Sequence, residues 1–199
     1  DIERLNLIDR DVHLIRLLKG PDQDLELILE KLQDYNTVLK YDGFMLICFK
    51  REKIEQPIPF DVRENVTKKG IVECLDNDIV SFVVDLEDYY ICIQNFDFNT
   101  DEKLKKELKD KAAEFANRVF EHLEQESGIY LTAVVSEIHK GVYELPKAYK
   151  EVNGLFEYKK ITANDERLLL YTDYYVSYDA WYEFGNTYHK FDEVRRLIT

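Results

Sequence analysis

The sequence has little proline, glycine or cysteine, and it has no long apolar segment. Its 199 residues include four prolines and seven glycines, too few for a flexible linker or a low-complexity tract. The longest apolar runs, such as residues 129–135, have the length of a strand, which excludes a membrane-spanning helix. No signal-peptide pattern opens the chain, which does not begin with Met. We therefore expect it to be a piece of a longer protein, with flanking domains removed.

The three cysteines do not have the spacing of a disulfide framework or a zinc site. Cys48, Cys74 and Cys92 are odd in number, lie far apart, and are each surrounded by apolar residues. This pattern is typical of buried structural thiols. We expect a reducing compartment, the cytoplasm.

Several catalytic patterns are also missing. No glycine-rich loop has the spacing of a P-loop or a dinucleotide-binding fold, and no serine is flanked by the glycines of a hydrolase nucleophile elbow. The histidines are scattered without metal-site spacing, so we expect ordinary surface or half-buried roles for them. The serines considered are Ser81, Ser127, Ser136 and Ser177, and the histidines are His13, His122, His139 and His189.

The charge balance is strongly acidic, with 27 basic and 40 acidic residues and a net charge of −13. Affinity for nucleic acid comes largely from basic side chains that neutralise phosphates, so direct contact with DNA is disfavoured. The acidity favours solubility, and an acidic docking surface is the alternative interpretation. Hydrophobic residues make up 45% of the chain, enough for the core of one domain with appended helices.

Hydrophobic periodicity predicts four helices. The third is the clearest, because Leu104, Leu108 and Ala112 begin a stripe with steps of three and four residues. Asp101 and Gly128 can cap its two ends. The four helices span residues 2–18, 22–35, 101–126 and 146–159, and a further helix begins near Phe191.

Apolar runs predict six strands, of which residues 43–50 form a central one because the run does not alternate. Residues 51–69, which include Pro57 and Pro59, are expected to be a loop with at most a short helix. The other strands span residues 71–75, 79–84, 89–94, 129–136 and 167–171. Strands 79–84 and 89–94 form a hairpin. The order predicts an α+β fold: a mainly antiparallel sheet with helices packed on its faces.

Two stretches resemble the GGDEF domain of nucleotide cyclases. In residues 129–160, a strand that ends in Ala133-Val134-Val135-Ser136 precedes a helix containing Ala148-Tyr149 and Leu155-Phe156-Glu157-Tyr158-Lys159. Residues 78–93 resemble the strand–turn–strand that holds the GGDEF signature. The order of elements is similar to the degenerate form of that domain in AraC-type (YesN-like or PucR-like) bacterial transcription regulators. The resemblance implies a ferredoxin-like, nucleotide-cyclase-like fold.

The resemblance also implies that the chain is not an enzyme. Asp85 and Leu86 occupy the positions of the two signature glycines, where a carboxylate and a branched side chain obstruct a triphosphate. Glu87 and Asp88 match the acidic pair, and Tyr89 matches the aromatic residue.

The end of the first strand carries two cations, Lys50 and Arg51, where the family has a metal-binding acid. Two-metal phosphoryl transfer needs carboxylates to hold the metal ions. We therefore expect no catalytic residue, no metal site and no cofactor. Weak metal binding at Glu87 and Asp88 is the alternative.

The region after residue 171 is rich in aromatic side chains. Such a segment either packs back on the domain or forms a contact with another domain or subunit; a cage for a cationic or sugar ligand is a third interpretation. The residues expected at such an interface are Tyr174, Tyr175, Tyr178, Trp181, Tyr182 and Phe184.

These observations predict a helical connector over residues 1–40, a degenerate GGDEF-like domain over 41–175, and an aromatic tail over 176–199 that leads to a DNA-binding domain. The expected function is non-catalytic signal relay in an AraC-type regulator, through domain packing or dimerisation. The expected partners are the other domains of the same protein and a second copy of the chain, without nucleic acid or membrane contact by this piece. The alternatives are a small-molecule sensor that uses the remnant nucleotide cleft and an active diguanylate cyclase.

Overall fold

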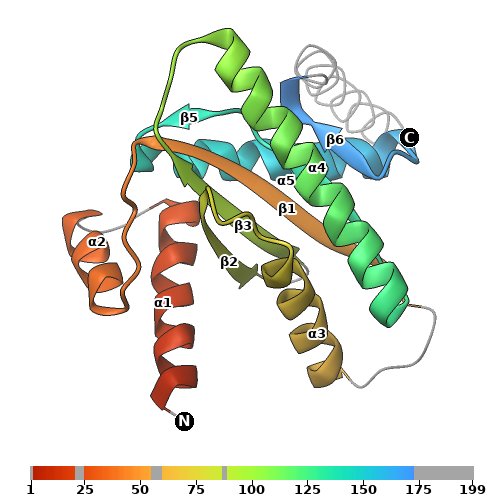
Figure 1. Cartoon of the computed structure of the whole chain (residues 1–199), viewed down its shortest axis with the longest axis horizontal. Helices are drawn as coiled ribbons and strands as arrows, with labels where there is room; N and C mark the ends of the chain where they lie inside the picture. The colour runs from red at the N-terminus through yellow and green to blue at the C-terminus, as the bar shows by residue number, and fades with distance from the viewer. Residues whose placement is uncertain (1, 21–24, 55–59, 87–88, 173–199) are drawn as a thin grey trace, which may run out of the picture.

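The computed structural model describes residues 2–20, 25–54, 60–86 and 89–172, with five α-helices and a six-stranded sheet in those ranges (Figure 1). In chain order they are α1 (Ile2–Lys19), α2 (Leu25–Asp34), β1 (Gly43–Ile54), α3 (Phe60–Glu73), β2 (Val80–Leu86), β3 (Tyr89–Phe96), α4 (Glu102–Ser127), β4 (Ile129–Val135), β5 (His139–Lys140), a 3₁₀ turn (Val142–Glu144), α5 (Leu145–Thr162) and β6 (Leu168–Leu170).

The strands lie in the order β2-β3-β1-β4-β6, and the short β5 pairs with β1. Strand β1 is antiparallel to both β3 and β4, and β2 is antiparallel to β3. Strand β6 is parallel to β4. The mainly antiparallel sheet and the central place of β1 are therefore confirmed. The units β1-α3-β2 and β3-α4-β4 are both split β-α-β units. Strand β3 lies between β1 and β2, and strand β1 lies between β3 and β4.

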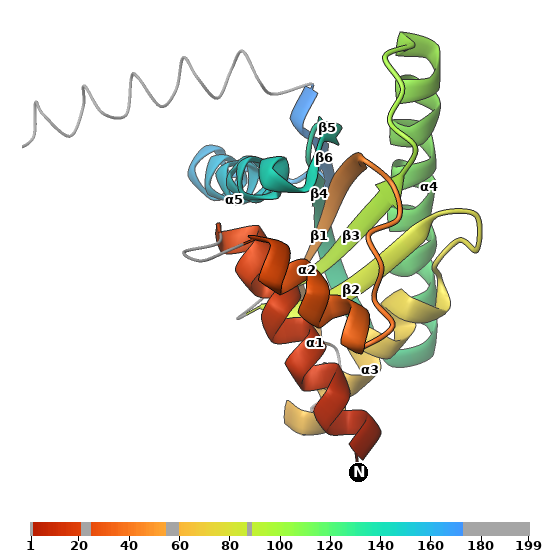
Figure 2. The ribbon, with the colours of Figure 1, turned by 90° about the vertical axis from the view of Figure 1, so that its left-hand side faces the viewer.

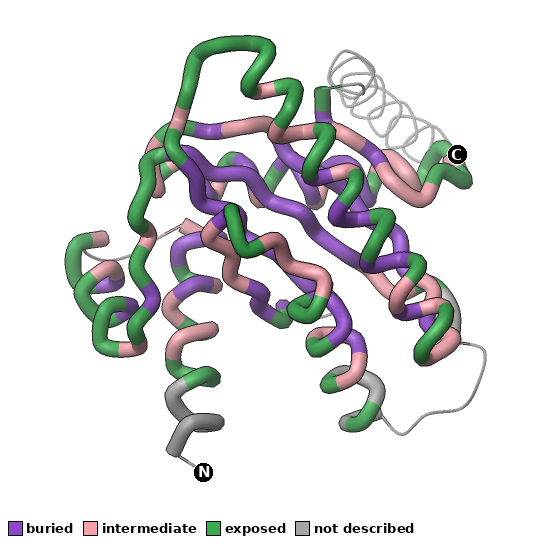
Figure 3. Tube along the Cα trace, viewed as in Figure 1, coloured by how far each residue is buried: buried purple, intermediate pink, exposed green. Residues whose placement is uncertain are grey.

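Helices cover both faces of the sheet, and alternate residues of β1 explain how. Phe44, Leu46 and Cys48 belong to the buried cluster that α1, α2 and α5 complete. The intervening residues, such as Met45 and Ile47, belong to the cluster completed by α3 and α4. The side view in Figure 2 shows these two helical layers, and Figure 3 shows that the central strands are buried along most of their length. A strand covered on both faces needs consecutive apolar residues without polar alternation, and residues 44–49 of β1 have this pattern.

The predicted loop at 51–69 and the predicted strand at 71–75 are wrong. Strand β1 continues to Ile54, and the helix α3 occupies residues 60–73. Among the α3 residues whose burial is described, Thr67, Gly70 and Ile71 are buried, at helical spacing. At Gly70 a Cβ atom would lie 2.5 Å from Cδ2 of Leu123. The missing side chain lets α3 approach α4 closely, so tertiary packing overrides the β propensity of this segment.

The predicted helix at residues 101–126 agrees closely with α4, including the residues at its two ends. The Asp101 side chain accepts a hydrogen bond from the backbone N–H of Lys103 at 2.8 Å, and Gly128 ends the helix in the left-handed conformation with φ of 60°. Ala112, at the middle of the predicted stripe, is buried against the sheet, as are the stripe residues that follow it. Leu104 is 41% exposed, because the first turns of α4 extend beyond the core.

Two of the three thiols lie in the core as predicted. Cys48 and Cys92 are buried on adjacent strands, but in the clusters on opposite faces of the sheet. Burial raises the pKa of the Cys48 thiol, and it raises the pKa of Cys92 to about 12. Cys74 is only partly buried, after the end of α3. None of the helices within the described ranges is long and apolar enough to cross a membrane.

Candidate functional site

Two of the residues that were compared with the GGDEF signature, Asp85 and Leu86, are ordinary strand residues in the β2–β3 hairpin. Asp85 pairs with Tyr90 and Leu86 pairs with Tyr89 in the antiparallel register. The Leu86 side chain is buried in the core beneath α1, α2 and α5. Glu87 and Asp88 lie outside the described residues. The hairpin is confirmed, but Leu86 holds a packing position rather than one that faces a nucleotide.

Asp85 takes part in an ion-pair network around the edge of the sheet. The Lys68 ammonium on α3 lies 3.3 Å from Oδ2 of Asp85 and 2.8 Å from Oδ2 of Asp11 on α1. Arg10 also pairs with Asp11, and its guanidinium donates to the carbonyl of Val83 at 3.4 Å. This network joins α1, α3 and the edge strand β2, and Asp85 contributes the contact from β2.

The two cations Lys50 and Arg51 lie within β1, before its end at Ile54 and not at the end as predicted, and they contact residues on opposite faces of the sheet. The Arg51 guanidinium donates to the hydroxyl of Tyr90 at 3.0 Å. The Lys50 ammonium lies 5.7 Å from the centroid of the Tyr89 ring, within the range of a cation–π contact. The Tyr89 ring in turn packs on Phe156 of α5, with 5.0 Å between centroids.

A cleft of about 320 Å³ opens beside Lys50, between β1 and the end of α5. Lys159, on its wall, donates to the carbonyls of Asn164 and Glu166 at 2.6 and 2.8 Å, which holds the turn after α5 against the helix. Glu52 accepts a hydrogen bond from the Thr132 hydroxyl at 2.8 Å. The residues that line the cleft are Lys50, Glu52, Phe156, Lys159, Lys160, Ala163, Asn164 and Asp165.

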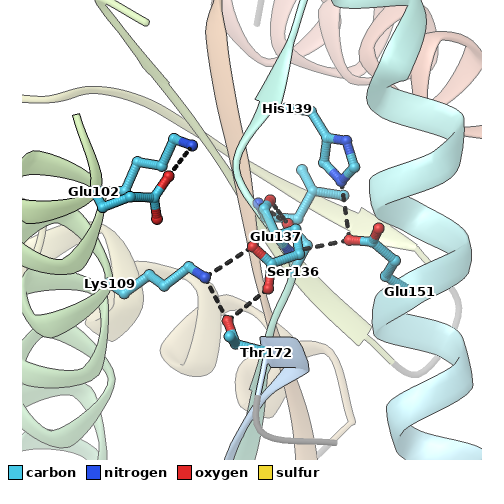
Figure 4. Close-up of polar contacts among 9 residues, drawn as sticks. Glu102, Lys109, Ser136, Glu137, His139, Glu151 and Thr172 are labelled. Atoms are coloured by element: carbon cyan, nitrogen blue, oxygen red, sulfur yellow. Dashed lines mark hydrogen bonds and ion pairs between the residues drawn. The ribbon is translucent and has the colours of Figure 1, made fainter. Parts of the chain in front are cut away.

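A second polar centre lies at the opposite end of β4, where side chains of α4, of α5 and of Thr172, two residues after β6, converge (Figure 4). We call it the polar clasp and define it as Lys109, Glu137, His139, Glu151 and Thr172. Lys109 comes from α4 and Glu151 from α5, and Glu137 is the second residue after the end of β4. Thr172 lies shortly after β6 and is the last residue that the structure describes.

Glu151 anchors the inner half of the clasp. Its side chain is 7% exposed, and Oε2 accepts the backbone N–H of Glu137 at 3.0 Å. The same oxygen lies 2.9 Å from Nε2 of His139, which is 6% exposed. A carboxylate has no hydrogen to offer, so His139 donates here. Two donors that would be costly to bury unpaired are satisfied by one carboxylate.

Glu137 anchors the outer half. Its Oε2 lies 2.8 Å from the Lys109 ammonium, and its Oε1 accepts the Thr172 hydroxyl at 2.5 Å. Lys109 also donates to the Thr172 hydroxyl. Burial opposes ionisation of Glu137, but the bonds from Lys109 and Thr172 outweigh it, and the pKa of Glu137 is lowered. The ionised carboxylate therefore ties α4 to the segment that follows β6.

Ser136 connects the clasp to the central strand. Its hydroxyl accepts the backbone N–H of Leu46 at 2.9 Å and donates to the carbonyl of Glu137 at 2.8 Å. With both functions engaged and the side chain buried, Ser136 is a structural residue rather than a nucleophile. Within the described ranges, no three His, Cys, Asp or Glu side chains gather as a metal site would require. The contacts of the clasp join α4, α5, the residues after β4 and the residues after β6.

The sequence-based prediction missed the clasp. His139 is buried and bonded instead of having an ordinary surface or half-buried role. One signal was available: Glu151 falls on the apolar stripe of α5 between Ala148 and Leu155, and all three are buried. A buried acid on an apolar stripe requires a donor partner. The aromatic residues expected at an interface, from Tyr174 to Phe184, and the helix expected near Phe191 lie outside the described residues.

No protein-family model matches the chain, and no curated protein matches it either.

Proposed function

We propose that the chain is a non-catalytic regulatory module with a degenerate GGDEF-like, ferredoxin-like fold, which relays a signal in an AraC-type transcription regulator. Two split β-α-β units around β1, with a further helix and parallel strand after β4, support this fold assignment. The pairing of Leu86 and the cations at Lys50 and Arg51 support the absence of catalysis.

The observation that carries the relay proposal is that α5 contacts both the first helix and the clasp. Helix α1 packs against α5 on one face of the sheet. Leu17 and Leu18 of α1 share a buried cluster with Ala148 and Val152 of α5. Glu151 lies between these two α5 residues in sequence and holds the backbone of Glu137. A shift of α1 against α5 would therefore act on the clasp, and through it on Thr172.

The proposed domain division follows from this route. Residues 1–40 would be the input connector even though α1 and α2 pack on the sheet, residues 41–175 the relay, and residues 176–199 the link to a DNA-binding domain. Packed cores move between discrete arrangements and do not deform continuously, so a small displacement of α1 can be passed on. The partners would be the other domains of the same protein and a second copy of the chain, in the cytoplasm.

Hydrogen exchange tests the relay. Leu17→Ala removes α1 packing on the α5 face, whereas Phe115→Ala removes packing of α4 on the opposite face. We expect Leu17→Ala to speed amide exchange in α5 and at Glu137 more than Phe115→Ala does, when compared at equal global stability. Equal effects of the two variants on α5 and Glu137 would refute the relay.

The second candidate function is a small-molecule sensor, and the cleft beside Lys50 is the observation that favours it. Its volume of about 320 Å³ lies within the range of ligand sites. Among the described residues, neither Lys50 nor Lys160 forms an ion pair with a carboxylate. A thermal-shift screen with nucleotides, cyclic dinucleotides and sugars tests this candidate, because a ligand of the folded state raises Tm by mass action. Loss of the shift in Lys50→Ala would assign the ligand to the cleft.

Incubation with GTP and Mg²⁺ tests the remaining alternative, an active diguanylate cyclase. The proposal predicts that no cyclic dinucleotide forms. Product formation by the purified chain would refute the non-catalytic assignment, whatever the outcome of the exchange experiment.

A further inference from the structure

Helix α1 has two apolar faces, and the fold covers one of them. Leu14, Leu17 and Leu18 are buried in the core. On the N-terminal half, Ile8 is 54% exposed and Val12 is 43% exposed. The N-terminal half of α1 extends away from the body of the molecule (Figures 1 and 2). Exposed branched side chains on a projecting helix indicate a contact surface that the described chain does not cover.

The exposed face has the spacing of a helix–helix seam. Ile8 and Val12, which are exposed, and Ile15, which is partly buried and packs against the core at the edge of this face, follow one another at steps of four and three residues. In the sequence, Leu5 extends the same series by another step of three. Alternating steps of three and four are those of a and d positions in a coiled coil, which fit the same seam on another helix. We call Ile8, Val12 and Ile15 the α1 seam.

The charges beside the α1 seam indicate which helix fits. Asp9 and Arg16 are exposed, lie seven residues apart, and so share one heptad position on the same side of the seam. In the described part of the chain neither forms an ion pair. When two copies of α1 cross antiparallel near Val12, Asp9 of each lies toward Arg16 of the other. The surface is thus complementary to itself, as a two-fold interface requires.

We propose that the α1 seam is the interface of a homodimer in which two copies of α1 pack antiparallel. This inference rests on the proposed relay, for which dimer geometry is one output, and it names the surface involved. A single pair of short helices buries little area, so the association is weak and depends on concentration. Dimerisation would couple the position of α1 in one subunit to that in the other.

Sedimentation equilibrium of the chain from about 10 μM to about 1 mM tests the proposal, because weak protein interfaces have dissociation constants in that range. We expect a monomer–dimer equilibrium that Ile8→Glu or Val12→Glu weakens about tenfold or more, because each dimer would bury two unpaired carboxylates. Leu27→Glu is the matched control, since Leu27 is 47% exposed on α2. It should leave the equilibrium unchanged. Circular dichroism of each variant confirms folding.

A charge exchange tests the orientation. Asp9→Arg should weaken dimerisation because like charges would then face each other at both ends of the seam, and adding Arg16→Asp should restore it. A chain that stays monomeric at the highest concentration would overturn the proposal, and so would equal weakening by Leu27→Glu. A dimer weakened by Ile8→Glu but indifferent to the charge exchange would overturn the antiparallel arrangement. The amide hydrogen-exchange measurement on Leu17→Ala is made on the monomer. Failure of the proposed dimer and failure of the proposed relay are therefore distinguishable.

Discussion

Truncation of Glu151 is the sharpest perturbation of the clasp. Glu151→Ala removes the carboxylate that accepts the backbone N–H of Glu137 at 3.0 Å and the His139 ring N–H at 2.9 Å. Both donors lie where the fold excludes most water. A buried donor without a partner costs about 1–3 kcal/mol. With two donors affected, we expect a loss of about 2–6 kcal/mol in the free energy of unfolding.

Urea denaturation followed by circular dichroism measures this loss. Glu151→Gln keeps one acceptor oxygen and should lose less than Glu151→Ala. Glu157→Ala is the matched control, because Glu157 is exposed on the same helix, and it should change the stability by no more than about 0.5 kcal/mol. A loss below about 1 kcal/mol in Glu151→Ala would mean that water replaces the carboxylate and that the inner half of the clasp is not tight.

Three other parts of the structure give predictions that denaturation or labelling can check. The folded-state pKa of Glu137 is lowered, so its carboxylate stabilises the fold above the unfolded-state pKa, and that contribution is lost as the pH falls through the folded value. Glu137→Gln should therefore be less stable than the parent at neutral pH, and the difference in the free energy of unfolding should shrink below about pH 4. Denaturation curves measured at several pH values test this, and a difference that does not change with pH would contradict it. An aromatic disulfide reagent should label Cys74 first, and Cys48 and Cys92 only on unfolding, because burial raises their pKa and blocks access; equal labelling rates in the native protein would refute their burial. Gly70→Ala should destabilise by about 1–3 kcal/mol, although alanine normally favours a helix, because the new methyl group meets a leucine side chain of α4 at 2.5 Å; a stabilised variant would show that α3 and α4 pack less closely.

Hydrophobic periodicity predicted most of the helices and strands because the apolar residues of each element mark the faces that the fold covers. Helix α4 presents a single apolar stripe to the sheet, and β1 is apolar on both faces because helices cover both. The segment from Arg51 to Leu75 failed for a local reason. Its β-branched residues at 71 and 72 favour a strand, and only the contact at Gly70 shows that a helix packs there.

The clasp was not predictable from the sequence because its partners are distant along the chain. Lys109 is 28 residues from Glu137 and 63 from Thr172. None of these three residues is unusual in its own segment, so only the fold brings them together. The signature-like residues present the opposite case. Asp85 and Leu86 were interpreted from the sequence as degenerate signature residues, and the structure shows Asp85 in an ion-pair network and Leu86 in the core. The regulatory assignment stays a prediction.

A double-mutant cycle between α1 and the clasp tests the relay most directly. The free energies of unfolding are measured for Leu17→Ala, Glu137→Gln and the double variant, with Leu17→Val as a milder replacement. The control cycle replaces Leu17→Ala by Ile71→Ala, which lies on the opposite face of the sheet. The relay predicts a coupling of about 0.5 kcal/mol or more for Leu17 with Glu137 and additivity in the control. Additivity in both cycles, within about 0.3 kcal/mol, would contradict it.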